Sequence, residues 1–241
     1  MRPIVCLIKF LPYPGINQSL SSLTLLVFLF FSPCLSTAGT LLYHFTMDKD
    51  TAFSSYIISK TQRGTTLSTE WRAETLSVKS ELLFDFSGNE QSWKSINIRE
   101  GTNVTVTHAG DSLVLTGTFK CKPVLKAFPL KGFSWKQMIP FDLVDLAFSA
   151  DEPLTFTTVA LMGPYALKTF HLRAKRIGDE TIFFRGTQTR AVHIRVSPVG
   201  FFSALWHGDY WFRKSDRVFI RSESSGMPGR PDAVMELIGE K

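Results

Sequence analysis

Polar and apolar residues alternate along much of the chain from Thr40 onward. The alternation is clearest in residues 96–98, 104–106, 192–196 and 235–237, where valine, isoleucine, leucine or methionine occupies every second position, and Leu113, Leu115 and Phe119 likewise share one face. Successive side chains of an extended strand point to opposite faces, so a period of two is typical of strands with one buried and one wetter face. The pattern therefore predicts a protein built from antiparallel strands.

Short turn signals separate these alternating runs. They include Arg63-Gly64, Ser87-Gly88-Asn89, Ala109-Gly110-Asp111, Gly178-Asp179 and Lys214-Ser215-Asp216. Glycine and asparagine tolerate the positive φ angles of tight hairpin turns. We therefore expect an all-β protein, with a strongly curved antiparallel sheet or an open or closed β-barrel of about 10–12 strands.

One stretch, residues 122–153, interrupts the pattern. Its four prolines are Pro123, Pro129, Pro140 and Pro153. Proline does not suit a central strand because it lacks the N–H group that the ladder needs. Residues 140–148 favour a short helix with a proline in its first turn. We expect a long crossover that covers an end or an open face of the sheet, between a front half (40–121) and a back half (154–241).

The first 38 residues have a different character. Two basic residues and no acidic one accompany an apolar run, 23–31, which Ser32-Pro33 ends. Small residues at Ser36 and Ala38 fit the positions recognised before signal-peptidase cleavage. The run is shorter than the ~20 apolar residues of a transmembrane helix, so we predict a signal peptide (1–38) and a single β-rich domain (39–241). The alternative is that the segment stays uncleaved as an N-terminal membrane anchor.

Net charge excludes one class of partner. The chain has 27 basic and 21 acidic residues, a formal net charge of +6, with no run of Lys or Arg. Charge this mild and scattered does not indicate a nucleic-acid partner. It is compatible with weak attraction to anionic lipid headgroups.

Few residues suggest catalysis or metal binding. His171 and His193 would face each other if their strands pair, and with Asp209 they would offer three metal ligands. We favour the alternative, in which both histidines lie on a solvated face beside Arg173 and Arg195. The sequence contains no Gly-x-Ser-x-Gly nucleophile turn. We predict that the protein is not an enzyme and uses neither a metal nor another cofactor.

Aromatic residues are the unusual component, with 21 Phe, five Trp and five Tyr. One interpretation places most of them in a filled core. The other is an incompletely filled barrel that encloses an apolar ligand, with aromatic residues as its lid or mouth. The residues predicted to bind this ligand are Phe128, Phe133, Trp135, Phe141, Phe201, Phe202, Trp206 and Trp211. Basic residues around the mouth, such as Arg213, Lys214 and Arg217, would meet an anionic headgroup.

The order of segments in the back half resembles that of a known group of proteins. Residues 187–196 (TQTRAVHIRV) precede an aromatic strand with Trp211, a charged turn, residues 217–221 (RVFIR) and a terminal MEL at 235–237. This order resembles the C-terminal half of exported bacterial proteins grouped as a domain of unknown function. The resemblance rests on hydrophobic pattern over 154–237. It implies a signal peptide, a periplasmic or secreted location and an architecture similar to open β-barrels that carry lipoproteins through the periplasm. It supplies no catalytic residue.

These features together predict an exported, non-enzymatic, β-barrel-like protein of the bacterial envelope, located in the periplasm, that binds an apolar ligand, a lipid or a lipoprotein. An alternative is a structural or assembly factor with a filled core, which acts on an envelope protein partner through a sheet edge or an aromatic patch. A hydrolase is the least supported interpretation. A carrier requires an apolar cavity, whereas an assembly factor requires a packed interior.

Overall fold

Fifteen β-strands make up most of the part of the chain that the computed structural model describes, which comprises residues 39–47, 50–61, 64–74, 77–149, 152–161, 166–200, 203, 206–225 and 232–241. The strands are β1 (Gly39–Met47), β2 (Asp50–Thr61), β3 (Gly64–Arg72), β4 (Ser77–Phe84), β5 (Glu90–Asn97), β6 (Thr102–Ala109), β7 (Ser112–Phe119), β8 (Lys122–Pro129), β9 (Ser134–Trp135), β10 (Leu154–Ala160), β11 (Lys168–Phe184), β12 (Thr187–Pro198), β13 (His207–Arg213), β14 (Phe219–Ser225) and β15 (Ala233–Glu240). The helices of this part are α1 (Ile139–Asp142) and α2 (Val144–Phe148). The predicted signal peptide, 1–38, lies outside the described residues, so it stays a prediction.

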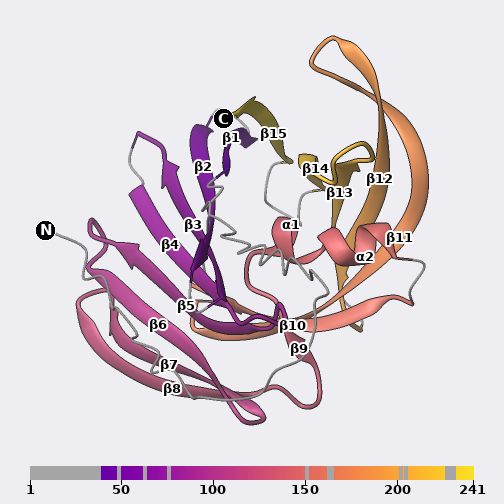
Figure 1. Cartoon of the computed structure of the whole chain (residues 1–241). Coiled ribbons are helices and arrows are strands. Elements are labelled where there is room, and N and C mark those ends of the chain that lie inside the picture. Colours follow the sequence, from indigo (N-terminus) through magenta and orange to yellow (C-terminus); the bar gives the residue numbers. More distant parts are fainter. Residues whose placement is uncertain are drawn as a thin grey trace, which may run out of the picture. The chain divides into compact units, whose positions relative to one another are not determined.

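All fifteen strands belong to one sheet, in the order β8-β7-β6-β5-β4-β3-β2-β1-β15-β14-β13-β12-β11-β10-β9. Strands adjacent in sequence pair with each other on both sides of the central β1–β15 ladder. Every ladder is antiparallel except the short one between β9 and β10. The sheet is strongly curved, and α1 and α2 lie inside its curve (Figure 1). The all-β prediction is confirmed, with more strands than expected and without closure into a complete barrel.

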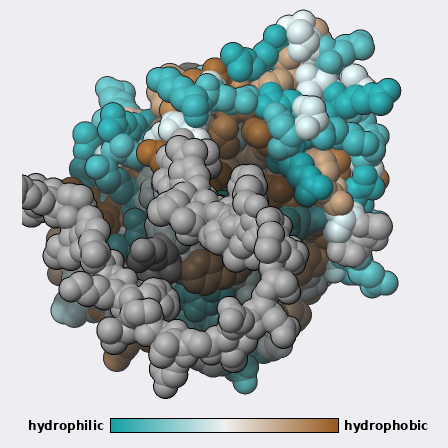
Figure 2. Space-filling model, in the orientation of Figure 1, coloured by the Kyte–Doolittle hydropathy of each residue, from teal (hydrophilic) through white to brown (hydrophobic). Residues whose placement is uncertain are grey.

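The predicted alternation places the core on the concave face of the sheet. Val104 and Val106 of β6 and Leu113 and Leu115 of β7 are fully buried, while Thr105 between the valines is only half-buried. The same holds in the back half and in the last strand, where the apolar positions of the pattern are buried. Hydrophobic residues are visible inside the hollow of the face shown in Figure 2, with hydrophilic residues around it.

In β5 the buried and the exposed positions are the reverse of those that the sequence suggested. Ser95 and Asn97 are buried, whereas Ile98 is 84% exposed in the turn that follows the strand. Trp93 fixes this register, because it pairs with the fully buried Leu82 of β4 and points inward. A period of two defines two faces, and the largest apolar side chain decides which face is buried.

The proline-rich stretch begins with a strand that the sequence argument did not expect. Residues 122–129 form β8, which pairs with β7 along its whole length. Proline is tolerated here because β8 is an edge strand, so only one side of its backbone needs ladder hydrogen bonds. The other edge is β9, and no ladder joins β8 to β9 among the described residues. Lys126 Nζ instead donates to the carbonyl oxygen of Leu167, 2.7 Å away in the turn before β11.

The rest of the crossover enters the concave face and is held there by Gln137. Its side-chain amide donates to the carbonyl oxygen of Val159 and accepts from the Val159 N–H, which attaches it to β10 as a strand residue would be. Its backbone N–H donates to Glu90 of β5, 3.0 Å away. The crossover is therefore fixed to both halves of the sheet.

The predicted helix at 140–148 forms as two short helices. Pro140 lies in the first turn of α1, as expected, and α1 ends at Asp142 before Leu143 begins the connection to α2. Arg176 of β11 donates to the carbonyl oxygen of Ala147, which holds α2 against the back half. Among the described helices, none has the length and apolar character needed to span a membrane.

Candidate ligand-binding interior

Phe141 of α1 lies among aromatic residues from strands that are far apart in the sequence. Its ring centroid is 4.6 Å from that of Tyr56 in β2, and 6.4 Å from those of Tyr43 in β1 and Phe219 in β14. Tyr43 and Phe219 stack on each other, with centroids 5.2 Å apart. We call Tyr43, Tyr56 and Phe219 the aromatic wall. Phe141 fills the space in front of this wall.

The aromatic wall is apolar but carries two phenol groups. The hydroxyl of Tyr43 donates to the carbonyl oxygen of Phe219, 2.8 Å away. Burial raises the pKa of both Tyr43 and Tyr56 far above the usual range, so both phenols remain neutral at physiological pH. Burial also raises the pKa of nearby Tyr210 to about 12. The wall thus offers aromatic surface without charge.

Three of the four crossover residues predicted from the sequence belong to the hydrophobic core or pack against it, and Phe133 does not. Phe128 of β8 and Trp135 of β9 are buried in the core, and Phe141 packs against it. Trp135 Nε1 donates to the side-chain oxygen of Gln137. Phe133 is half-buried in front of β9, with its ring centroid 4.9 Å from that of His171.

The remaining predicted residues do not form one group. Trp206 is half-buried and packs against the core just before β13. Trp211 alternates with the half-buried Tyr210 and the buried Phe212, so it points to the opposite, convex face. Phe201 and Phe202 lie outside the described residues. The structure therefore separates Trp211 from the proposed lid.

The convex cluster around Trp211 contains His193 and Asp209, two of the three residues considered as metal ligands in the sequence. His193 stacks on Trp211, and its Nε2 lies 2.7 Å from Asp209. Arg195 donates to the same carboxylate at 2.8 Å. Burial alone would raise the pKa of Asp209, but hydrogen bonds from Arg195 and His193 outweigh it and lower the pKa. His171 does not join the cluster, because it lies against Thr157 at 3.0 Å.

The three basic residues expected at the mouth are already engaged. Arg213 forms ion pairs with Asp216 and with Glu240, both within 3 Å. Lys214 pairs with Asp179 of β11. The guanidinium of Arg217 lies over the ring of Phe148 in α2, 5.2 Å from its centroid. These contacts stabilise the rim of the sheet, so binding of a headgroup there must compete with them.

Two carboxyl groups meet in the interior behind α1. Glu90 of β5 is 4% exposed, and its Oε1 accepts from the Gln137 N–H. Asp142 accepts from the Met138 N–H at 2.7 Å. The second oxygens, Glu90 Oε2 and Asp142 Oδ1, are buried and receive no hydrogen bond from a described donor.

The carboxyl pair favours a bound proton. Burial, and then the nearby charge of Asp142, raise the pKa of Glu90 well above its usual range. Burial likewise raises the pKa of Asp142, against the opposing charge of Lys136. One proton shared between the two groups removes their repulsion and satisfies both unpartnered oxygens. The contact of α1 with β5, through Asp142 and Glu90, therefore depends on the protonation of this pair.

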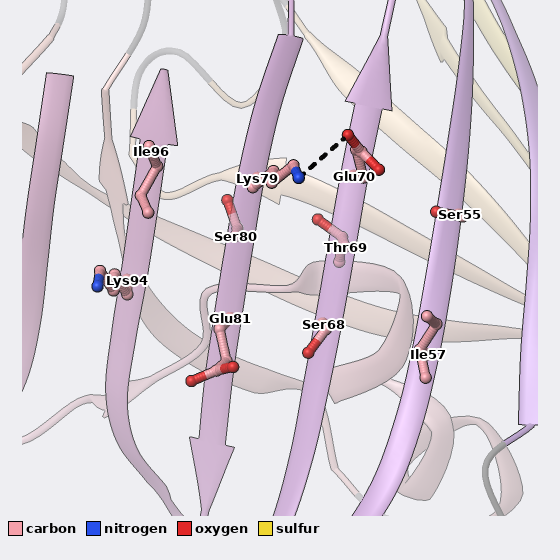
Figure 3. A pocket seen from close by; sticks show the side chains of 10 residues that line it. All are labelled: Ser55, Ile57, Ser68, Thr69, Glu70, Lys79, Ser80, Glu81, Lys94 and Ile96. Carbon is pink, nitrogen blue, oxygen red and sulfur yellow. Dashed lines mark ion pairs between the residues drawn. The ribbon is translucent and has the colours of Figure 1, made fainter. Parts of the chain in front are cut away.

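A separate groove of about 370 Å³ lies on the front half of the sheet. Figure 3 shows residues of β2 to β5 that line it, including Ile57 and Ile96 at its two sides. Its charged residues have both signs, and Lys79 pairs with Glu70 at 3.6 Å. The groove contains none of the residues predicted to bind a ligand, and its balanced charge favours no particular ligand.

Sequence reasoning missed the aromatic wall and the carboxyl pair. The wall could have been found, because Tyr43, Tyr56 and Phe219 occupy inward positions of alternating strands, whereas our prediction concentrated on aromatic residues in loops. The carboxyl pair leaves no sequence signal, since Glu90 and Asp142 come from separate elements that meet only when the crossover folds back.

Comparison with known proteins supports the fold alone. No protein-family model matches the sequence, and no curated protein matches it either. The crystal structure of a β-barrel-like protein of a domain of unknown function, DUF1849, from Brucella abortus is similar, with a TM-score of 0.59 and 9% sequence identity. The match covers 85% of this chain and 97% of that one. The chain thus has the fold of an uncharacterised β-barrel-like domain.

Proposed function

We propose that the protein is an exported component of the bacterial envelope that binds an apolar ligand, such as the acyl chain of a lipid or lipoprotein, inside the curved sheet. In this proposal the crossover is a lid, and α1 occupies the ligand site when no ligand is bound. The protein acts without catalysis. The predicted signal peptide supports export, and the β-barrel-like fold is compatible with a carrier.

The single observation that carries the proposal is the position of Phe141. This one side chain of a four-residue helix fills the space in front of the aromatic wall, which would become an apolar surface if α1 moved away. Burial of a phenylalanine stabilises by up to ~3 kcal/mol, and each buried methylene by ~0.8 kcal/mol. About four methylenes of a ligand would therefore replace the contacts of Phe141.

Beyond Gln137, the lid is attached more weakly than a strand of the sheet would be: α1 belongs to no ladder of the described strands, and α2 is held by the hydrogen bond from Arg176 to the carbonyl oxygen of Ala147. No ladder closes the gap between β8 and β9 in the described residues, and Lys126 crosses toward the β10–β11 turn with a single hydrogen bond. The carboxyl pair of Glu90 and Asp142 further weakens the contact of α1 with β5 whenever it loses its proton. In this proposal α1 can therefore move away from the aromatic wall without disrupting the sheet.

A fluorescent fatty-acid probe tests this proposal. The protein should bind the probe at micromolar concentration, and a membrane extract should displace it. Phe141→Trp enlarges the side chain at the site and should weaken binding, whereas Phe86→Trp, at an exposed turn, should not change it. Absence of binding at micromolar concentration, or equal binding by both variants, would count against the interior as the site.

One observation favours the alternative of an assembly factor. Leu125 of the edge strand β8 is 79% exposed beside backbone groups that no described strand pairs with. Pro123, Pro129 and Lys122 in the same strand oppose strand addition, since such residues protect sheet edges. Leu125→Lys should abolish partner binding in this alternative and leave fatty-acid binding intact.

A further inference from the structure

The hairpin of β11 and β12 extends beyond the rest of the sheet. β10 pairs with β11 only as far as Ala174, and β13 pairs with β12 only from Ala191 onward. Residues 181–184 of β11 and 187–190 of β12 therefore have only each other as sheet neighbours among the described strands. Figure 1 shows this two-stranded ribbon projecting at the upper right.

Most of the chain's net charge resides on this hairpin. From Lys168 to Pro198 it has seven basic and two acidic residues, a net charge of +5, against +6 for the whole chain. The basic residues are thus concentrated on one hairpin in the structure, although they are scattered along the sequence. Both acidic residues are engaged: Asp179 pairs with Arg176 and Lys214, and Glu180 accepts a hydrogen bond from Trp211.

The tip of the hairpin combines cations with an exposed aromatic ring. Arg185 and Gly186 form its two-residue turn, with φ angles of 48° and 81°. Arg185 and Arg190 are exposed, and no described acidic residue forms an ion pair with either. Phe183 lies two residues before Arg185 and pairs with Gln188 of β12, and its side chain is 71% exposed. The combination of an exposed aromatic ring with unpaired cations is the one that favours the interface of an anionic membrane.

Beside the tip lies a polar groove of about 460 Å³. It is lined by Gln188, Thr189, Arg190, Arg213, Lys214 and Ser215. Arg213 and Lys214 already have acidic partners, which leaves Arg190 as the cation able to meet an anion in this groove. The groove has room and hydrogen-bond donors for a phosphate headgroup next to the exposed ring.

We infer that the tip of the β11–β12 hairpin docks on the surface of an anionic lipid bilayer, with Phe183 in the interfacial region and Arg185 and Arg190 on the headgroups. Basic residues near an anionic membrane surface are attracted by its potential, and aromatic rings favour the interface. A soluble acidic partner would satisfy the arginines but would not explain the ring. This surface is separate from the aromatic wall, so the inference goes beyond the proposed function and does not depend on it.

A fluorophore attached at the hairpin tip of the full chain tests the inference. Any binding through residues 1–38 affects every variant equally, so differences between variants report on the labelled position. With Cys6, Cys34 and Cys121 replaced by serine, Phe183→Cys carries an environment-sensitive fluorophore. The matched control is Phe86→Cys, since Phe86 is 81% exposed at another turn. The labelled proteins are mixed with phosphatidylcholine vesicles that contain a lipid-depth quencher. The vesicles are prepared with and without about a third of phosphatidylglycerol.

The expected result is a blue shift and quenching at position 183 but not at position 86, only with phosphatidylglycerol and reversed by high salt. Each arginine near the surface contributes about five-fold in partitioning, so Arg185→Gln with Arg190→Gln should raise the lipid concentration for half-maximal quenching about 30-fold. Lys60→Gln with Lys122→Gln, equal in charge change and exposed elsewhere, should leave it unchanged.

Three results of the vesicle experiment, and one of a control experiment, would overturn the inference. The vesicle results are no response at position 183, an equal response at positions 183 and 86, and a response that does not depend on lipid charge. Equal binding of the labelled tip to duplex DNA or to inorganic phosphate at the same phosphate concentration would also overturn it. Fatty-acid binding by the Arg185→Gln and Arg190→Gln variant should persist, which separates failure of this inference from failure of the proposed function.

Discussion

Replacing Glu90 with glutamine tests whether the buried carboxyl pair limits stability at neutral and alkaline pH. Glutamine has nearly the same shape, and its oxygen can still accept from the Gln137 N–H. Its amide N–H can donate to Asp142 Oδ1, which receives no hydrogen bond from a described donor in the native chain. The substitution therefore keeps the packing and removes one ionisation.

The direction of the pH effect follows from the raised pKa values. Unfolded carboxyl groups titrate near pH ~4, whereas burial raises the pKa of Glu90 and of Asp142 in the folded state. Stability from the shared proton is therefore fully present below pH ~4 and is lost as the pH rises through the folded pKa. Between the unfolded-state and folded-state pKa values, the free energy of unfolding falls by about 1.4 kcal/mol per pH unit for each proton.

Urea denaturation at pH 4, 6 and 8, followed by tryptophan fluorescence, gives the comparison. We expect Glu90→Gln to match the native chain within ~0.5 kcal/mol at pH 4 and to exceed its free energy of unfolding by about 2 kcal/mol at pH 8. The control Glu81→Gln removes an exposed carboxylate of β4 and should follow the native curve. If the native and Glu90→Gln proteins lose stability in parallel between pH 4 and 8, the shared proton does not hold α1 in place.

Three further substitutions test other parts of the structure. Phe141→Ala should lower the free energy of unfolding by about 3 kcal/mol in urea, because it leaves a cavity before the aromatic wall; a loss below 1 kcal/mol would contradict its packing. Asp209→Asn should cost about 1 kcal/mol at pH 7 and progressively less as the pH falls below ~4, since the lowered pKa of Asp209 provides stability that is lost as pH falls through the folded-state pKa; a constant difference across pH would refute this. Gly117→Ala should lower the melting temperature strongly, because its φ is +125° and a Cβ would lie 2.2 Å from the carbonyl oxygen of Asn103; an unchanged melting temperature would contradict this close approach.

Alternation predicted the fold class and most buried positions because burial on one face imposes a period of two on each strand. It failed at Ile98, since the same period fits both faces and only packing of Trp93 on Leu82 selects between them. The density of prolines wrongly argued against a strand at residues 122–129. The penalty for proline in a strand assumes that neighbouring strands pair on both sides, and β8 has one on only one side among the described strands. Which strand becomes the edge is decided by the whole sheet order, and that order is not readable from local sequence.

The candidate site was predictable only in part. Phe141 and Trp135 were found because apolar residues between prolines must be covered by the sheet or exposed. The aromatic wall depends on β1, β2 and β14 meeting through the β1–β15 ladder, which joins the two ends of the described chain. The hairpin tip was missed because charge was judged along the chain, whereas the β11–β12 ladder places the basic residues of 168–198 on one hairpin.

Isotope-filtered NMR of the protein with a bound ¹³C-labelled fatty acid tests the central claim most directly. If the ligand replaces Phe141 in front of the wall, its methylene protons should show nuclear Overhauser effects to the rings of Tyr43, Tyr56 and Phe219. Effects confined to convex-face residues such as Ile57 and Ile96, with none to these three rings, would contradict an interior binding site.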